Sequence, residues 1–245
     1  MDKKLYIIKL IAILFLISIF FFMAGCDDST EVIENQYQNS INILKEQVYT
    51  RNGNAKKISQ VYLEYKTTGN YDIFAYTSSS ALLGSGKIED GILNFNISQI
   101  EEANLIDWEE FEIVFKQWGN VTCSTAIKCT MFLLYAYDGT NLIGILDRQR
   151  IIGTSSTITQ ETLMYIYVDN NCTIKGRKSS GYEKNNFYYI TKNDLDLQLK
   201  KGWNLVTRTE KYSTDISGYA TISMEIKPIT NPQDYKWVIE LGYRL

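Results

Sequence analysis

The sequence of 245 residues contains no histidine. Histidine is the usual general base near neutral pH and a common ligand of zinc, because its side chain changes charge in that pH range. Its absence excludes Ser-His-Asp and Cys-His catalysis as well as His-ligated zinc. We therefore expect a protein that is not an enzyme, with no catalytic residues, no metal site and no cofactor.

Basic charge and proline are also in short supply. The chain has 25 Lys and Arg against 28 Asp and Glu, and it has only two prolines. A protein that binds nucleic acid needs basic side chains to offset the phosphate charge, so we expect no nucleic-acid partner. The rarity of proline leaves long stretches free to pair as β-strands, because proline cannot donate a hydrogen bond within a sheet.

One long apolar run lies at the N-terminus. Lys3 and Lys4 precede it, and residues 10–23 are apolar apart from Ser18. A membrane span needs roughly 20 apolar residues, so this run is short for a transmembrane helix. A positively charged start followed by a short apolar core is typical of a cleaved secretory signal.

The end of this run, Met23-Ala24-Gly25-Cys26, resembles the lipobox of bacterial lipoproteins, with Met23 in place of the usual leucine. The resemblance implies that residues 1–25 are a signal peptide, that Cys26 carries diacylglycerol and that its new amine is acylated. Two or three acyl chains, such as palmitate, anchor a protein stably to a membrane. We expect a protein of the bacterial cell envelope, at the outer surface or the periplasmic face. The alternative is an uncleaved N-terminal helix with a chance cysteine.

Three more cysteines lie in the body of the chain: Cys123, Cys129 and Cys172. Outside the cytoplasm, Cys123 and Cys129 can close a small disulfide loop, which leaves Cys172 unpaired. Three buried or free thiols are the alternative. Their spacing matches no standard metal site.

Residues 26–55 separate the anchor from the body. Ile33, Tyr37, Ile41, Leu44 and Val48 are spaced as on one face of an amphipathic helix. We predict a lipid-anchored helix here, with a polar tether as the alternative. The β-rich ectodomain is then expected at residues 56–245.

From Ser59 onward, apolar and polar residues alternate as they do in strands. Asp90-Gly91 indicates a two-residue hairpin turn, because both central positions of such a turn need positive φ. Residues 130–137 are apolar on both faces and predict a central strand covered on each side. Ser98 and Glu101 form a capping box, which predicts a short helix over 99–106. The expected strands are 60–66, 71–76, 82–89, 92–97, 130–137, 142–147, 163–168, 173–177, 187–191, 195–200, 203–209, 221–227 and 235–241.

About a dozen short strands at regular spacing argue for an all-β, mainly antiparallel fold. We predict a β-sandwich or a barrel-like body with one or two short helices. The polar stretch near 153–158 is the best candidate for a sub-domain boundary.

Several segments of this body are similar to envelope lipoproteins of spirochaetes and similar bacteria. They are Gly86-Lys87 to Gly91, Tyr165 to Asp169, Leu199 to Asn204, and Lys236-Trp237. The similarity rests on structural hairpins, so it implies a compartment and a β-rich body and carries no activity.

Aromatic side chains are abundant, with 18 tyrosines and four tryptophans. Aromatic rings on the surface of a sheet can bind sugar rings or partner proteins. They are also favoured simply as strand formers, which is the alternative. By alternation, the tyrosines expected to face outward are Tyr62, Tyr65, Tyr76, Tyr188, Tyr189 and Tyr219.

These observations predict a non-catalytic binding or structural module of the cell envelope, with a protein or a glycan as its ligand. One alternative is a barrel-like carrier of a small apolar molecule, which requires an enclosed apolar cavity. A less favoured alternative is a hydrolase that uses paired carboxylates, which requires two close acids with raised pKa in a cleft.

Overall fold

The computed structural model describes residues 40–241, except 53–63, 78–79, 98–99, 113–114, 116–118, 154–156, 185–186, 215–218 and 230. Within the strands, the side chains of residues 52, 64, 182–184, 187–189, 214 and 219 are not described either. The lipobox and Tyr62 therefore lie outside the described residues. Residues 37–245 form one compact unit.

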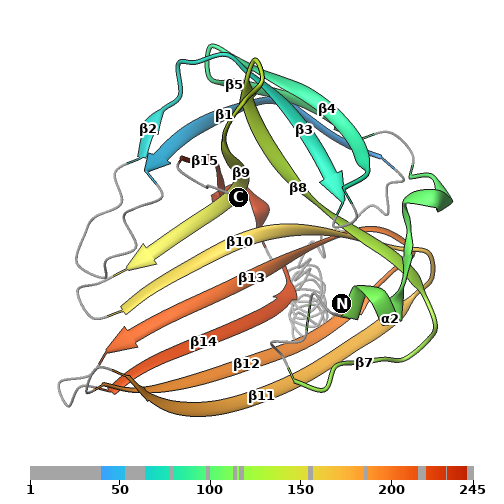
Figure 1. Ribbon diagram of the computed structural model, residues 1–245, viewed down its shortest axis with the longest axis vertical. Helices are drawn as coiled ribbons and strands as arrows, with labels where there is room; N and C mark the ends of the chain where they lie inside the picture. The colour runs from blue at the N-terminus through green and yellow to red at the C-terminus, as the bar shows by residue number, and fades with distance from the viewer. Residues whose placement is uncertain are drawn as a thin grey trace, which may run out of the picture. The chain divides into compact units, whose positions relative to one another are not determined.

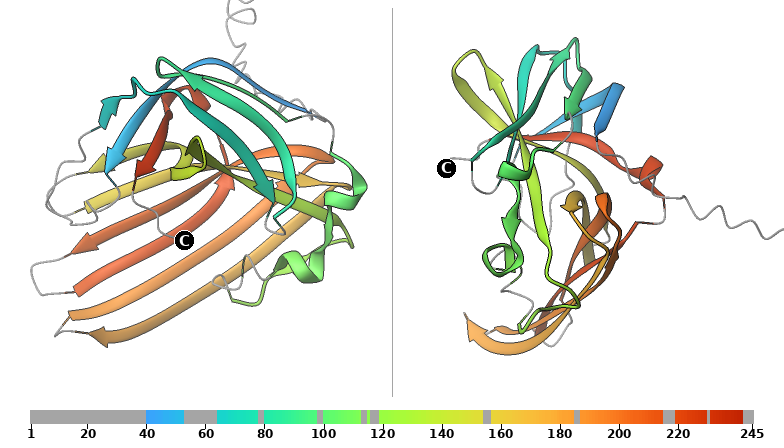
Figure 2. Two further views of the ribbon diagram at one scale, coloured as in Figure 1. Left: turned by 45° about the horizontal axis from the view of Figure 1, so that its top comes forward. Right: turned by 90° about the vertical axis from the view of Figure 1, so that its right-hand side faces the viewer.

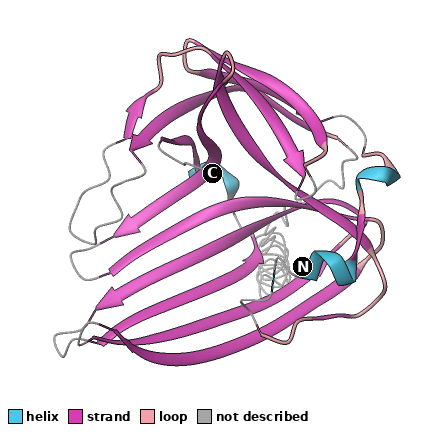
Figure 3. Cartoon of the chain, viewed as in Figure 1, coloured by secondary structure: helices cyan, strands magenta, loops and turns pink. Residues whose placement is uncertain are grey.

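The chain is all-β, as predicted, with one short α-helix (Figure 3). The strands are β1 (Ile41–Asn52), β2 (Glu64–Lys66), β3 (Tyr71–Thr77), β4 (Leu82–Glu89), β5 (Ile92–Ile97), β6 (Ile106–Asp107), β7 (Thr122–Cys123), β8 (Lys128–Asp138), β9 (Asn141–Gly153), β10 (Thr157–Val168), β11 (Cys172–Lys184), β12 (Phe187–Leu199), β13 (Gly202–Thr214), β14 (Tyr219–Pro228) and β15 (Lys236–Leu241). The helical elements are α2 (Trp108–Phe111) and the 3-10 turns η1 (Glu102–Asn104) and η3 (Pro232–Asp234). None of the helices among the described residues is long and apolar enough to cross a bilayer.

Eight strands close into a mixed β-barrel, which settles the choice between sandwich and barrel (Figure 1). Around the barrel the order is β3, β4, β5, β1, β15, β9, β10 and β8. The strand β8 closes the barrel. One of its edges pairs with β3, and the other pairs with β10 near the start of β8 and with β9 toward its end. The pairing of β1 with β15 is parallel, so the two ends of the described chain meet in the barrel wall.

The sheet continues beyond the barrel as a curved outer sheet of β10, β13, β14, β12, β11 and β7 (Figures 1 and 2). Its strands are longer than the sequence suggested. The segments expected at 173–177, 187–191 and 195–200 are two strands of 13 residues, β11 and β12, paired along their whole length. The polar stretch near 153–158 joins β9 to β10, and these two strands pair directly.

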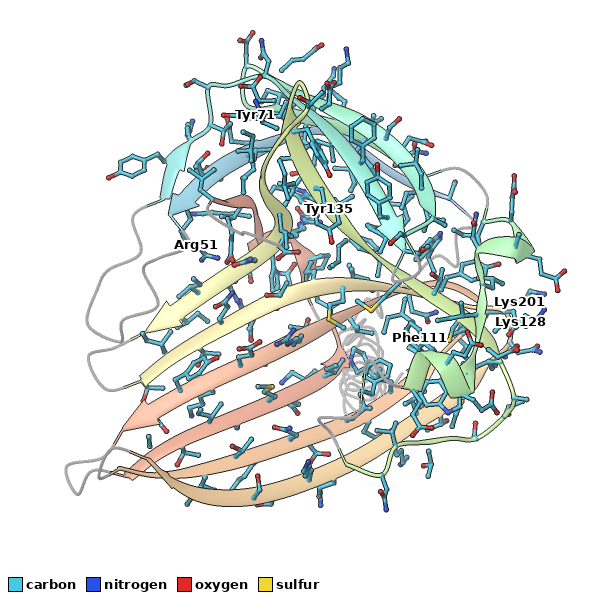
Figure 4. All side chains as sticks on the ribbon, viewed as in Figure 1. Arg51, Tyr71, Phe111, Lys128, Tyr135 and Lys201 are labelled. Atoms are coloured by element: carbon cyan, nitrogen blue, oxygen red, sulfur yellow. The ribbon has the colours of Figure 1, made fainter. Side chains whose placement is uncertain are left out.

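Two hydrophobic cores hold the unit together. The barrel core is filled by large side chains of the barrel strands, among them Phe95, Phe132 and Trp237, and by Trp203 of the adjoining strand β13. The second core lies between the outer sheet and the segment that contains α2, where Phe111 is fully buried (Figure 4). Because side chains alternate along a strand, β10 sends Tyr165 and Tyr167 to the barrel core and Ile166 and Val168 to the second core.

The helix predicted over Ile33–Val48 is wrong for its described part, because residues 41–52 form β1. The helical spacing has a local cause. A bulge between Leu44 and Glu46 inserts an extra residue, and Lys45 has a φ of 59°. Ile41 and Ile43 therefore point into the core, Leu44 is 67% exposed, and Val48 is the next fully buried residue. Pairing with β5 and β15 outweighs the local helical pattern.

The hairpin predicted at Asp90-Gly91 is confirmed, with φ of 51° and 77° at the two turn positions. The helix predicted over 99–106 is reduced to the single turn η1, and its expected cap Ser98 lies outside the described residues.

Two glycines with positive φ provide a matched test of the turns. A Cβ added to Gly91 would lie 1.9 Å from the carbonyl oxygen of Thr67, whereas one added to Gly139 would meet nothing within 4 Å. We expect Gly139→Ala to cost about 1 kcal/mol from backbone strain alone. Gly91→Ala should cost clearly more, because Thr67 donates its own N–H to Val48 and cannot move freely. Urea unfolding of both variants measures the difference, and equal losses would contradict this account of the turn.

Candidate functional site

Four aromatic side chains lie together on the outer surface of the barrel, and we call this set the aromatic face: Phe74, Tyr76, Tyr135 and Tyr137. The face arises from strand alternation. On β3 and β8, the neighbours of these rings along the chain point inward and are buried, while the rings themselves are half-buried. Phe74 is directly opposite Tyr135 in the paired strands (Figure 4 labels Tyr135).

The rings of the aromatic face support one another. Phe74 and Tyr137 meet edge to face with centroids 5.7 Å apart, and Tyr76 and Tyr135 do so at 6.0 Å. Such contacts contribute about 0.5–1.5 kcal/mol each beyond area burial. Leu133, on the same side of β8, is 41% exposed. The result is a rigid, partly apolar surface that is already ordered without a ligand.

A polar hollow of about 350 Å³ lies at the Tyr137 end of the aromatic face. Side chains of both charge signs line it: Asp72, Glu89 and Asp138 are acidic, and Lys87 is basic. These side chains come from the ends of β3, β4 and β8, where hairpins bring them together. The hollow can supply hydrogen-bond donors and acceptors to a ligand that rests on the rings.

A smaller cavity of about 120 Å³ lies at the Leu133 end, where β8 turns from β9 to β10; we call it the fork cavity. Asp147, Arg208 and Trp237 line it together with apolar side chains. Among the described residues, Arg208 Nε and Trp237 Nε1 are buried donors without a hydrogen-bond partner. The fork cavity is mainly apolar, with Asp147, Arg148 and Arg208 as its charged lining residues. From Leu133 to Tyr137 along β8 is about 13 Å, so the two hollows are within reach of one short ligand.

Asp147 is the titratable group most strongly affected by this arrangement. Part of its side chain lines the fork cavity, yet protein atoms surround it closely. Burial, and then the nearby charge of Glu240, raise its pKa to about 6, although a hydrogen bond from Gln149 and the charges of Arg208 and Arg51 oppose the shift. Asp147 therefore changes charge near the lower end of the physiological pH range.

Behind Asp147, a buried polar network links the barrel strands. Arg51 is 3% exposed, pairs with Glu240 and donates to Gln149 Oε1 (Figure 4 labels Arg51). Gln149 Nε2 in turn donates to Glu240 Oε1 at 3.1 Å, and Gln160 Nε2 donates to Gln149 Oε1 at 3.2 Å. Buried charges persist only when they are paired and hydrogen-bonded. The ion pair of Glu240 with Arg51 and its hydrogen bond from Gln149 thus hold β1, β15 and β9 together.

The structure assembles only one of the tyrosines expected from the sequence, Tyr76, into the aromatic face. Tyr65 is 63% exposed on the short strand β2. The backbones of Tyr188 and Tyr219 are paired on β12 and β14, and Tyr189 lies beside them, but the three side chains are not described. Tyr62 lies outside the described residues.

Sequence reasoning missed Phe74, Tyr135 and Tyr137. The prediction that residues 130–137 are covered on both faces is wrong, because the outer face of β8 is half-exposed. Strand alternation is the signal that could have placed Tyr135 and Tyr137 on one face. The identity of the neighbouring strand, β3, was the missing information.

The cysteines of the body are free thiols. Cys123 is half-buried, whereas Cys129 and Cys172 are buried. The thiol of Cys123 donates to Thr125 O at 3.2 Å. Burial is the main cause of the raised pKa of Cys172, and the nearby Cys123 adds to it. The disulfide predicted between Cys123 and Cys129 is not formed in this structure.

The chain finds no match among known protein families, curated proteins or solved structures.

The raised pKa of Asp147 makes stability depend on pH. Because the folded pKa of about 6 lies above the ordinary aspartate pKa of 3.8, the stabilising effect of the bound proton is full below about pH 4. It is lost as the pH rises through 6, at a cost of about 3 kcal/mol. Asp147→Asn cannot ionise, so its free energy of unfolding relative to the parent should rise by up to this amount between pH 4 and pH 7.

Urea unfolding at pH 4, 5, 6 and 7 measures this difference, with Asp138→Asn at an exposed turn position as the matched control. A difference that stays constant with pH for Asp147→Asn would show that this carboxyl is not perturbed.

Proposed function

We propose that this chain is a non-catalytic binding module of a bacterial cell envelope, anchored by lipid on Cys26, and that it binds its ligand on the aromatic face. The observation that carries the proposal is the outward side of β3 and β8, where four rings lie in contact between the polar hollow and the fork cavity. Ordered aromatic surfaces with a few convergent polar groups are characteristic of binding sites.

A glycan suits this surface better than a flat protein surface does. A sugar presents an apolar ring face and hydroxyl groups that both donate and accept hydrogen bonds. The rings of the aromatic face match the apolar ring face of a sugar. The charged side chains that line the two hollows, among them Asp147 and Arg208 in the fork cavity and Asp72 and Lys87 in the polar hollow, match the hydroxyl groups.

The alternatives find less support. A carrier of an apolar molecule needs an enclosed cavity of several hundred Å³, and the barrel interior is instead filled by side chains such as Phe95, Phe132 and Trp203. A hydrolase needs two available carboxylates. Asp147 has a neighbouring acid in Glu240, but Glu240 is held by Arg51 and Gln149, and the fork cavity is too small for a sugar ring and a water together.

The binding proposal is tested with the full chain in detergent, labelled with a fluorophore and applied to an array of soluble oligosaccharides. We expect binding to a subset of glycans, reduced at least about tenfold by the double substitution Tyr135→Ala and Tyr137→Ala, since each lost stacking contact is worth about 1 kcal/mol or more. Tyr65→Ala is the matched control, because it removes an exposed tyrosine outside the aromatic face.

Equal binding by the double variant and the control would contradict the placement of the site on the aromatic face. Unfolding curves of both variants show whether a loss of binding reflects a loss of the fold.

The anchor is tested separately, by feeding labelled palmitate to bacteria that express the full chain. The parent should incorporate the label, and Cys26→Ser should lose it completely and retain residues 1–25. Cys123→Ser, which changes a cysteine of the body, should be labelled like the parent. Label that persists in Cys26→Ser would contradict the anchor.

A further inference from the structure

We propose that Cys123 and Cys172 form a disulfide bond with each other. Cys123 first reacts with an external disulfide, and Cys172 then attacks the resulting mixed disulfide. The pair links the short strand β7 to the start of β11. It is independent of the ligand bound on the aromatic face and of the lipid on Cys26.

Strand register brings the two residues together. Cys123 lies opposite Ile174 in the antiparallel pair of β7 and β11, so Cys172, two residues before Ile174, is its diagonal neighbour on the same face. Ser124 extends the pairing, because its N–H donates to Thr173 O at 3.0 Å and its Oγ accepts from Thr173 N–H at 2.9 Å. Both cysteines face the second core, and Cys123 is close enough to Cys172 to add to the effect of burial in raising the pKa of the Cys172 thiol.

The third thiol, that of Cys129, lies near the other two, because Cys172 and Cys123 both add to the effect of burial in raising its pKa. Its residue on β8 is paired with Val168 on one side and with Ile106 on the other, so the backbone is fixed at both edges. The side chain is fully buried in the second core. A disulfide needs close Cα atoms and converging Cβ vectors, and a backbone held at both edges can adjust little to meet that geometry. β7 has two residues and can adjust more easily.

Exposure decides which thiol reacts first. Cys123 is partly open to solvent, whereas Cys172 is 6% exposed and its burial raises the pKa of its thiol to about 12. The Cys123 thiolate attacks one sulfur of a disulfide donor, forms a mixed disulfide and releases the donor's other half as a thiolate. Cys172 then loses its proton to solvent, and its sulfur attacks Cys123 Sγ and expels the second half. The protein loses two electrons and two protons, and the donor is reduced to two thiols.

Trypsin separates the three cysteines, which makes the pairing directly measurable. Cleavage after lysine and arginine places Cys123 in peptide 117–128, Cys129 in peptide 129–148 and Cys172 in peptide 151–175. The full chain in detergent is incubated with oxidised glutathione, unfolded in the presence of an alkylating reagent, digested without reduction and analysed by mass spectrometry. We expect peptide 117–128 linked to peptide 151–175, with peptide 129–148 alkylated and the link lost on reduction.

Three results would overturn the proposal: a link between 117–128 and 129–148, alkylation of all three cysteines, or glutathione that remains on Cys123 of the parent protein. Two variants sharpen the assignment. Cys172→Ala should trap glutathione on Cys123, because the second thiol is missing. Cys129→Ala should form the link as the parent does, and a loss of the link there would assign the bond to Cys129. The experiment on the parent chain needs no variant to fold.

Discussion

The whole unit depends on the division of one edge of β8 between two neighbours. Near its start, β8 pairs with β10, and toward its end it pairs with β9. The second pairing closes the barrel on itself, and the first lets the sheet continue outward through β13, β14, β12 and β11. Because buried backbone groups must find partners, this shared edge fixes how the barrel and the outer sheet join.

The same division creates the features that a ligand could use. Where β8 leaves β9, the strands separate and side chains do not fill the gap, which is the fork cavity. Asp147 stands at its edge with a raised pKa, and the barrel core on the other side is closely filled. The outward side of β8 places Tyr135 and Tyr137 against β3. A closed barrel with a filled interior can present a binding surface only on its outside or at its ends.

The two cores place different demands on their side chains. The barrel core is enclosed by strands on all sides, and its polar support is the Arg51–Gln149–Glu240 network in the wall. The second core has a sheet on one side and short segments around α2, β6 and β7 on the other. A covalent link from β7 to β11 would secure a covering segment that is held to the outer sheet by a two-residue strand.

The sequence by itself determined the all-β class, most strand positions, the Asp90-Gly91 hairpin and the absence of histidine chemistry, because alternation and turn residues act locally. Only the tertiary structure decided that residues 41–52 are a strand, that β8 has an outward side beside Phe74, and that Cys123 adjoins Cys172. Each of these depends on which distant strand is the neighbour, and strand pairing is a long-range choice that no local pattern specifies.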